Sequence, residues 1–393
     1  MENLIKSKHS GLIVAILTLG VFGIINTEMG VVGIIPLIAE TFGVTVPQAG
    51  WTVSIFALLV AISAPIMPLL FSGINRKKVM LLALGIFVAS NIVSIFAKDF
   101  TVILIARAIP AVFHPIYVSM AFTVAAQSVP KEQAPKAVSR IFIGVSAGMV
   151  LGVPVTSYIA SETSFSVAMI FFAAVNLLVL IATIIFVPSI PVKERLSYGS
   201  QLSVLKYAIT WHSLLAVILI NGAMFGFFSF MSDYLQNITA LPFKIISIFL
   251  LIYGGANIIG NIIAGKLLAT KPISTIKVIP FIMLLVYGAL YLIGELSIPM
   301  AVIILVLGIL AGIASNNCQW MISNAASKAP DFANGLFLAS TNLGTMLGTS
   351  FCGMFISQWG TRYSVFGALI FLVLGILFIF LRGRVKQSDN AIQ

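Results

Sequence analysis

Hydrophobic residues follow one another along this chain in long runs, which polar residues, prolines or glycines interrupt at fairly regular intervals. Each run is long enough to cross about 30 Å of hydrocarbon as a helix. The pattern therefore predicts twelve membrane-spanning helices, over residues 11–36, 47–71, 79–97, 100–126, 137–161, 164–187, 212–236, 244–267, 277–294, 298–324, 333–358 and 364–381.

The overall composition supports a membrane protein. Of the 393 residues, 60% are hydrophobic and 8% are charged, whereas soluble domains carry about 25% charged residues. Twelve spans leave only short connections, so we expect no separate soluble catalytic domain. The first run follows Lys6 and Lys8, as in a signal peptide, but it lacks a small-residue cleavage site, so we interpret it as a retained helix.

The basic residues predict the orientation. With the N-terminus inside, eighteen Lys and Arg residues fall in cytoplasmic segments and three, Lys98, Lys244 and Arg362, fall outside. This asymmetry is typical of multi-pass proteins with basic cytoplasmic loops. It predicts that both termini are cytoplasmic and that the protein lies in the bacterial cytoplasmic membrane. The net charge of +11 is then explained by the basic cytoplasmic loops. We expect the lipid bilayer as a partner and no nucleic acid.

The chain divides into two related halves. The longest connection, 188–211, separates an N-terminal six-helix bundle, 1–187, from a C-terminal one, 212–393. Gly148 and Gly152 recur as Gly344 and Gly348, both at an offset of 196 residues. Two similar halves in parallel orientation predict an all-α membrane protein of two pseudo-symmetric bundles, with a substrate site between them near mid-membrane.

Glu28 and Arg107 are charged residues within predicted spans, where an unpaired charge costs several kcal/mol. At 1.5 Å per residue, Glu28 lies about 12 Å and Arg107 about 10 Å below the outer surface. Because the two depths match, we expect the side chains to pair or to compete for one another across the cavity. Either the pair is a static link between two helices, or Glu28 exchanges a proton while Arg107 tunes its pKa.

Two further titratable residues are proton-coupling candidates. His114 lies near the middle of the fourth span, where it is either a hydrogen-bonded packing residue or a group that handles substrate or protons. Asp233 lies nearer the outer end of the seventh span, where we expect a solvated or gate residue.

Uncharged side chains supply substrate-cavity candidates. Amides within apolar spans must face the bundle interior, where they bond either another helix or a ligand. The candidates are Phe113, Asn221, Asn257, Asn316, Gln319, Trp320 and Asn342.

Small residues predict close helix contacts. Gly144, Gly148 and Gly152, followed by Pro154, form a strip along one face of the fifth span. Such a strip lets two helix backbones approach, either as fixed packing or as a sliding contact. Cys318 and Cys352 lie in apolar stretches, so we expect neither a disulfide nor a metal site.

These motifs together resemble a known family. The sequence is similar to the drug:proton antiporter family with twelve helices, within the major facilitator superfamily. The similarity lies in the opening of the chain, the fourth span with Arg107 and His114, the glycine strip of the fifth span, and the eighth and eleventh spans. The opening motif consists of Thr27-Glu28-Met29, Gly33, Pro36, Ile38-Ala39, Gly43-Val44 and Ala49-Gly50, and the later ones include Gly260, Asn261, Gly265, Asn342, Leu343, Gly344, Gly348 and Gly353. The similarity is closest to the branch of chloramphenicol-resistance, arabinose-efflux and purine-efflux proteins.

The resemblance implies a proton-coupled exporter of drugs or metabolites that works by alternating access. It implies a proton gradient as the energy source, no cofactor, and small-molecule substrates and protons as partners; we expect a monomer. The fifth-helix motif, Gly144 to Pro154, is typical of antiporters and favours export.

The chain departs from the superfamily pattern at two places. In the loop after the second span the acidic residue is missing, while the basic Arg76 and Lys77 remain. Pro115 stands where this branch usually has a glycine.

Three alternatives remain open. A sugar or purine nucleoside efflux carrier would suit the amide-rich second half. An intramembrane enzyme is disfavoured because the sequence offers no paired catalytic groups or zinc spacing. A membrane sensor is disfavoured because no room remains for an output domain.

Overall fold

The computed structural model describes residues 10–130, 133–191, 199–327 and 329–391. The basic residues Lys6, Lys8, Lys131, Lys193, Arg195 and Lys328, which entered the orientation argument, lie outside these ranges. The described part is built of helices. The first half contains α1 (Ser10–Met29), η1 (Gly30–Ile34), α2 (Ile35–Phe42), α3 (Val46–Ala49), α4 (Trp51–Ser63), α5 (Met67–Leu70), α6 (Arg76–Ile95), α7 (Phe100–Gln127), α8 (Ala134–Val150), α9 (Gly152–Glu162) and α10 (Phe165–Phe186).

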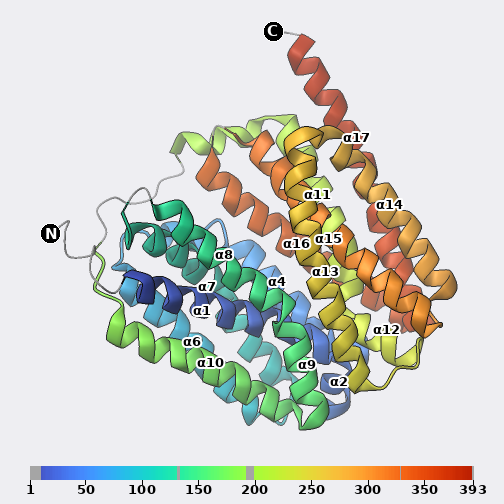
Figure 1. Ribbon diagram of the computed structural model, residues 1–393, viewed down its shortest axis with the longest axis horizontal. Helices are drawn as coiled ribbons and strands as arrows, with labels where there is room; N and C mark the ends of the chain where they lie inside the picture. The colour runs from blue at the N-terminus through green and yellow to red at the C-terminus, as the bar shows by residue number, and fades with distance from the viewer. Residues whose placement is uncertain (1–9, 131–132, 192–198, 328, 392–393) are drawn as a thin grey trace.

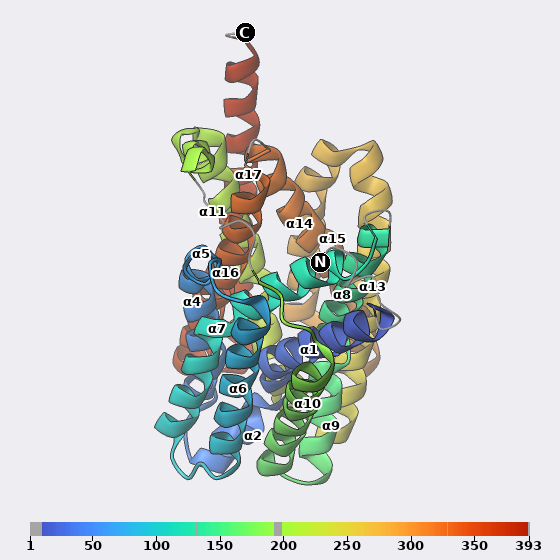
Figure 2. The ribbon, with the colours of Figure 1, turned by 90° about the vertical axis from the view of Figure 1, so that its left-hand side faces the viewer.

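The second half follows η3 (Gly199–Lys206), which lies in the connection between the halves. It contains α11 (Ala208–Ser229), α12 (Met231–Asn237), α13 (Phe243–Thr270), α14 (Pro272–Ile293), α15 (Ser297–Ala325), α16 (Pro330–Trp359), η4 (Thr361–Tyr363) and α17 (Ser364–Ala391). The two sets of helices form the two bundles in Figure 1, and Figure 2 shows them from the side.

The spans correspond to those predicted from the hydrophobic runs. Among the described residues, eleven helical segments are long and apolar enough to cross a membrane. The remaining span, the eleventh in chain order, is α16, which has 30 residues but contains more polar side chains. Its polarity is tolerated because it packs between α4, α11 and α17 inside the protein.

Local sequence sets several helix starts. The side chain of Asn75 accepts hydrogen bonds from the backbone N–H groups of Lys77 and Lys78 at the start of α6. Asp99 does the same for Thr101 at the start of α7. This exposed carboxylate has its pKa lowered, chiefly by the bond from the Thr101 backbone. Thr45 and Gln48 form a capping box at α3.

Some spans are not continuous helices. The first span changes from α-helix to 3₁₀-helix at Gly30, and the fifth is interrupted at Leu151, three residues before Pro154. Proline removes a backbone donor and disrupts the preceding turn, which explains the second break. By contrast, α7 continues through both Pro110 and Pro115.

The two halves contact each other near the ends of the spans that the topology places outside. Ser247 of α13 donates a hydrogen bond to Ser157 of α9 at 3.0 Å, and Lys244 pairs with Glu162 at 3.2 Å. Ser232 of α12 donates to the carbonyl of Gly33 at 3.2 Å. The described structure is therefore closed toward the outside.

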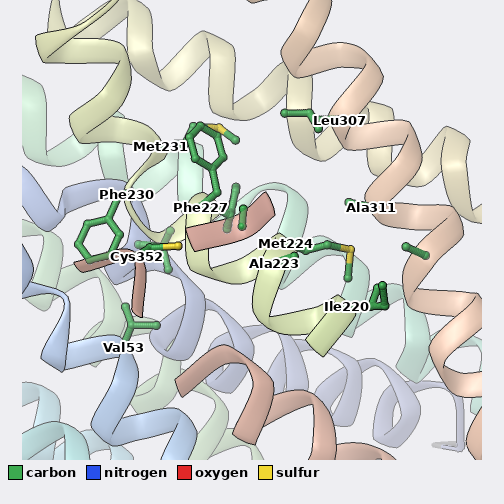
Figure 3. Packing of buried hydrophobic residues seen from close by; sticks show 14 of the residues in the cluster. Val53, Ile220, Ala223, Met224, Phe227, Phe230, Met231, Leu307, Ala311 and Cys352 are labelled. Carbon is green, nitrogen blue, oxygen red and sulfur yellow. The ribbon is translucent and has the colours of Figure 1, made fainter. Parts of the chain in front are cut away.

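An aromatic residue fills the centre of this contact. Phe230, between α11 and α12, is fully buried and packs against Gly50 of the first half. A side chain on Gly50 would collide with its ring. Figure 3 shows Phe230 and Cys352 of the second half close to Val53 of α4, and all three belong to one buried cluster.

Candidate functional site

Arg107 of α7 binds the backbone where α1 ends. Its guanidinium donates hydrogen bonds to the carbonyl oxygens of Thr27 at 2.7 Å and Glu28 at 3.0 Å, and to that of Thr52 at 3.1 Å. The last carbonyls of an α-helix lack donors from their own helix, and α1 gives way to a 3₁₀-helix at Gly30. Arg107 therefore satisfies freed carbonyls and ties α1 to α4.

The carboxylate of Glu28 contacts His114 instead of Arg107. Oε2 of Glu28 lies 3.0 Å from Nε2 of His114, and both residues are buried. The contact is short, but its direction does not satisfy a hydrogen bond at His114. The predicted side-chain pairing of Glu28 with Arg107 is therefore wrong. The planar guanidinium of Arg107 binds the backbone carbonyls at the end of α1, and the carboxylate of Glu28 contacts the imidazole of His114 instead.

Phe56 of α4 adjoins both of these basic groups. The guanidinium carbon of Arg107 lies 4.7 Å from the ring centroid of Phe56, a cation–π geometry. The ring of His114 meets Phe56 edge to face, with 5.9 Å between centroids. The two basic groups are thus placed around one apolar ring.

Amides in the first half, which we did not single out from the sequence, surround this site. Asn176 of α10 donates to the hydroxyl of Thr27 at 2.9 Å, and Asn91 of α6 lies at 3.5 Å from the same oxygen. Asn26 is fully buried, and its side-chain oxygen and nitrogen have no partner among the described residues. The signal that could have found them is the same as in the second half, an amide within an apolar run.

A cavity lies between the halves beside this site. Met29, which follows Glu28, and Met149 of α8 line it from the first half. Met224 and Phe228 of α11 and Asn257 of α13 line it from the second half. Figure 3 shows Met224 and, on α15, Ala311, which is another of the lining residues. Among the sequence-predicted cavity candidates, the structure places Asn257 in this lining.

Several of the other candidates bond their own bundle. Asn221 of α11 donates to the carbonyl of Thr341 at 2.5 Å and to the Thr345 hydroxyl at 3.0 Å, both on α16. Asn342 donates to Leu338 within α16 at 3.0 Å. These amides join helices or stabilise one helix.

The remaining candidates lie elsewhere. Phe113 packs against Phe71, with 6.3 Å between ring centroids, and Gln319 is exposed. Trp320 lies under the guanidinium of Arg382, whose central carbon is 5.6 Å from the centroid of the Trp320 ring. Arg382 itself is buried and donates to Ser213 and Asn324, although the sequence suggested a cytoplasmic loop residue.

Asp233 is buried in α12 and both of its carboxylate oxygens accept hydrogen bonds. Thr361 donates to Oδ2 and Asn237 to Oδ1, each at 2.7 Å. The expectation of a solvated position is wrong, because the start of η4 covers this residue. The bonds join the outer end of the seventh span to the start of the twelfth.

The glycine strips lie at equivalent contacts in the two halves. Gly144, Gly148 and Gly152 face α1, where a side chain on Gly144 would collide with the carbonyl of Thr18. Gly344 and Gly348 face α11 in the same way, and a side chain on Gly348 would collide with the carbonyl of Gly222. Pro154 is buried two residues after Gly152, inside α9.

The basic loop residues bind the ends of neighbouring spans. The side chain of Arg76 bonds Gln127 at the end of α7, and its backbone N–H donates to Ile190 at 3.1 Å. Lys77 donates to the carbonyl of Ile184 in α10 at 2.8 Å. This loop therefore joins three spans of the first half at the cytoplasmic face.

Two six-helix bundles around a central cavity define a membrane transporter, and comparison with known proteins gives the family. The model of the Major Facilitator Superfamily matches residues 17–331. The chain belongs to this superfamily, whose members are transporters of small substrates and not enzymes.

Relatives extend over nearly the whole chain. The inner membrane transport protein YdhP of Escherichia coli K12 is 27% identical over 377 residues, which cover 95% of this chain and 96% of that protein. The MFS-type transporter YtbD of Bacillus subtilis is 31% identical over 381 residues, covering 93% and 96%. These similarities and the apolar helices identify a multi-pass protein of the cytoplasmic membrane.

Solved structures share the fold. A bacterial homolog of the human lysosomal transporter Spinster, in an inward-facing and unoccupied conformation, aligns with a TM-score of 0.78 at 16% identity, covering 98% of this chain and 99% of that one. The nucleoside transporter NupG aligns with a TM-score of 0.77 at 16% identity, covering 96% and 99%.

Proposed function

We propose that this protein is a proton-coupled exporter of small organic compounds that works by alternating access, with Glu28 and His114 as the proton-exchanging pair. The observation that carries the proposal is the buried 3.0 Å contact between these two side chains. Carboxyl and imidazole groups are the side-chain types that form proton relays within membrane pumps and transporters. Glu28 is followed in the chain by Met29, which lines the cavity between the halves.

The geometry supports a connection from this pair to the outer contact. Glu28 lies at the end of α1, just before η1. Gly33 in η1 accepts the hydrogen bond from Ser232 of the second half. Arg107 holds the carbonyls of Thr27 and Glu28. A proton gained or lost at the pair changes the charge beside this clamp, and thereby the position of η1 against the second half.

The pair also suits a two-state cycle energetically. A charge in a buried site is costly unless it is paired. With Glu28 ionised, a protonated His114 and the nearby Arg107 compensate it; when the carboxyl takes up a proton, this attraction is lost. The proton gradient can therefore bias the equilibrium between the two orientations of the halves, which is what coupled export requires.

Transport by the purified protein in proteoliposomes tests this proposal. A panel that contains a labelled sugar, a purine nucleoside, chloramphenicol and ethidium should reveal a solute whose efflux depends on an imposed pH gradient. Glu28→Gln should abolish the gradient-driven component while exchange of that solute across the membrane at equal pH continues. The matched control is Glu295→Gln, at an exposed residue that pairs with Arg362, which should keep both activities. Gradient-driven efflux at the normal rate in Glu28→Gln would contradict the proposal.

A further inference from the structure

The wall of the cavity between the halves consists mainly of methionine, aromatic and aliphatic residues. Met29, Met149 and Met224 line it together with Phe228 and Tyr253, and none of the described lining residues carries a charge. Methionine is flexible and polarizable and packs well against aromatic rings. The wall is therefore adaptable and apolar.

Two aromatic rings of different helices are stacked on each other in this wall. Phe228 of α11 and Tyr253 of α13 are stacked, with 4.6 Å between ring centroids and 22° between ring planes. A flat ring in the cavity can pack on this pair or against its edge.

A chain of three amides ends at the same wall. Asn316 of α15 donates to the carbonyl of Gly312 at 2.9 Å and to Oδ1 of Asn261 at 2.6 Å. Asn261 in turn donates to Oδ1 of Asn257 at 3.1 Å. Asn257 is the member of this chain that lines the cavity.

The direction of this amide chain is fixed by its anchored end. A backbone carbonyl can only accept, so the group of Asn316 that faces Gly312 is its NH₂, and the same NH₂ then donates to Asn261. Each following amide accepts with its oxygen and donates with its nitrogen. The last atom of the chain is therefore the NH₂ of Asn257, which keeps its donor capacity for the cavity.

Glycines hold this arrangement in place. A side chain on Gly312 would collide with the carbonyl of Asn257, and one on Gly260 would collide with that of Ile309. Because α13 and α15 approach this closely, the three amides reach one another across the helix contact.

We propose, as an extension of the exporter function above, that this cavity, which has a volume of about 30 Å³ here and widens when the two halves move apart, takes neutral, flat, largely apolar solutes that carry a hydrogen-bond acceptor such as a carbonyl oxygen. The ring lies against Phe228 and Tyr253, and the acceptor receives a hydrogen bond from the NH₂ of Asn257. A cation would be desolvated beside a donor with no carboxylate in the described lining. A sugar would leave several hydroxyls without partners against methionine and phenylalanine.

Three probes of similar size test the proposal by equilibrium dialysis against the full-length protein in nanodiscs, with empty nanodiscs as the partition blank. Coumarin is a neutral bicycle with a lactone carbonyl, 1,2-dihydronaphthalene lacks the acceptor, and N-methylquinolinium is a planar cation. Coumarin should bind saturably, and the other two at least about tenfold more weakly, as expected for the loss of one hydrogen bond in a buried site.

Variants assign the donor. Asn257→Leu should weaken coumarin binding by about tenfold and leave dihydronaphthalene unchanged, and Asn257→Asp should reverse the preference toward N-methylquinolinium. The matched control is Asn317→Leu, because Asn317 lies on α15 beside Asn316 but points toward the carbonyl of Thr275 on α14. It should bind coumarin like the wild type. Thermal unfolding confirms that each variant is folded.

The outcomes separate this inference from the exporter function. Absence of saturable coumarin binding, equal binding of dihydronaphthalene, preference of the wild type for the cation, or full coumarin affinity in Asn257→Leu overturns it. Binding is measured without a pH gradient, so failure of gradient-driven efflux in a protein that binds coumarin as described overturns the proton coupling and leaves the ligand class intact.

Discussion

The guanidinium of Arg107 binds the carbonyl oxygen of Thr27 at 2.7 Å, from a helix 80 residues further along the chain. The same side chain binds the carbonyls of Glu28 and Thr52. A buried arginine is thus used as a multiple backbone donor, and the carboxylate expected to neutralise it contacts His114.

This clamp makes Arg107 hard to replace, even by lysine. Arg107→Lys keeps the charge but cannot reproduce three bonds in one plane. We expect a loss of at least about 1.5–3 kcal/mol of stability, the range for one hydrogen bond to a charged group, measured as a lower unfolding temperature in detergent. Arg384→Lys, at an exposed residue of α17, should unfold like the wild type. Equal unfolding temperatures for both variants would show that the clamp contributes nothing.

The glycine contact between α11 and α16 predicts a sharp difference between two alanine variants. Gly348→Ala places a methyl group against the carbonyl of Gly222, and overpacking of this kind costs about 1–3 kcal/mol. Gly265→Ala meets open space and should be neutral or stabilising by up to about 1 kcal/mol, the helix preference of alanine over glycine. Thermal unfolding of the two proteins measures the difference, and the reverse order would exclude a packing role for Gly348.

The outer contact can be locked covalently. The hydroxyl oxygens of Ser157 and Ser247 are 3.0 Å apart across the two halves, so Ser157→Cys combined with Ser247→Cys should form a disulfide under mild oxidation. Because the link holds the outside closed, transport should stop and should return on reduction. Each single variant serves as a control, since Cys318 and Cys352 are buried. Unchanged transport by the fully cross-linked protein would show that this contact does not open during the cycle.

Asp233 and Glu28 should respond differently to loss of charge. Both oxygens of Asp233 accept hydrogen bonds from Thr361 and Asn237, which is a structural arrangement. Asp233→Asn keeps one acceptor and should retain gradient-driven efflux, whereas Asp233→Leu should lower the unfolding temperature because both hydrogen bonds of this buried residue are lost. Loss of gradient-driven efflux in a stably folded Asp233→Asn protein would place Asp233 in the coupling machinery.

The sequence by itself determined the class of this protein. Apolar runs of membrane-spanning length can be satisfied only as helices in a bilayer, and the distribution of Lys and Arg predicts the orientation. The glycine strips could be located as well, since close approach of two helices needs residues without side chains. These features depend on residues that are close together in the sequence, so they can be predicted from the sequence alone.

Only the tertiary structure decided which buried groups meet. Glu28 and Arg107 were predicted at matching depth, but depth specifies neither the rotation of a side chain about its helix axis nor the freed carbonyls at the end of α1. Because of these two features, Arg107 binds the backbone and Glu28 contacts His114. The same holds for the amides, of which Asn257 lines the cavity while Asn221 bonds α16. An amide in an apolar run must find a partner, but the packing of helices far apart in sequence determines whether that partner is a helix or a ligand.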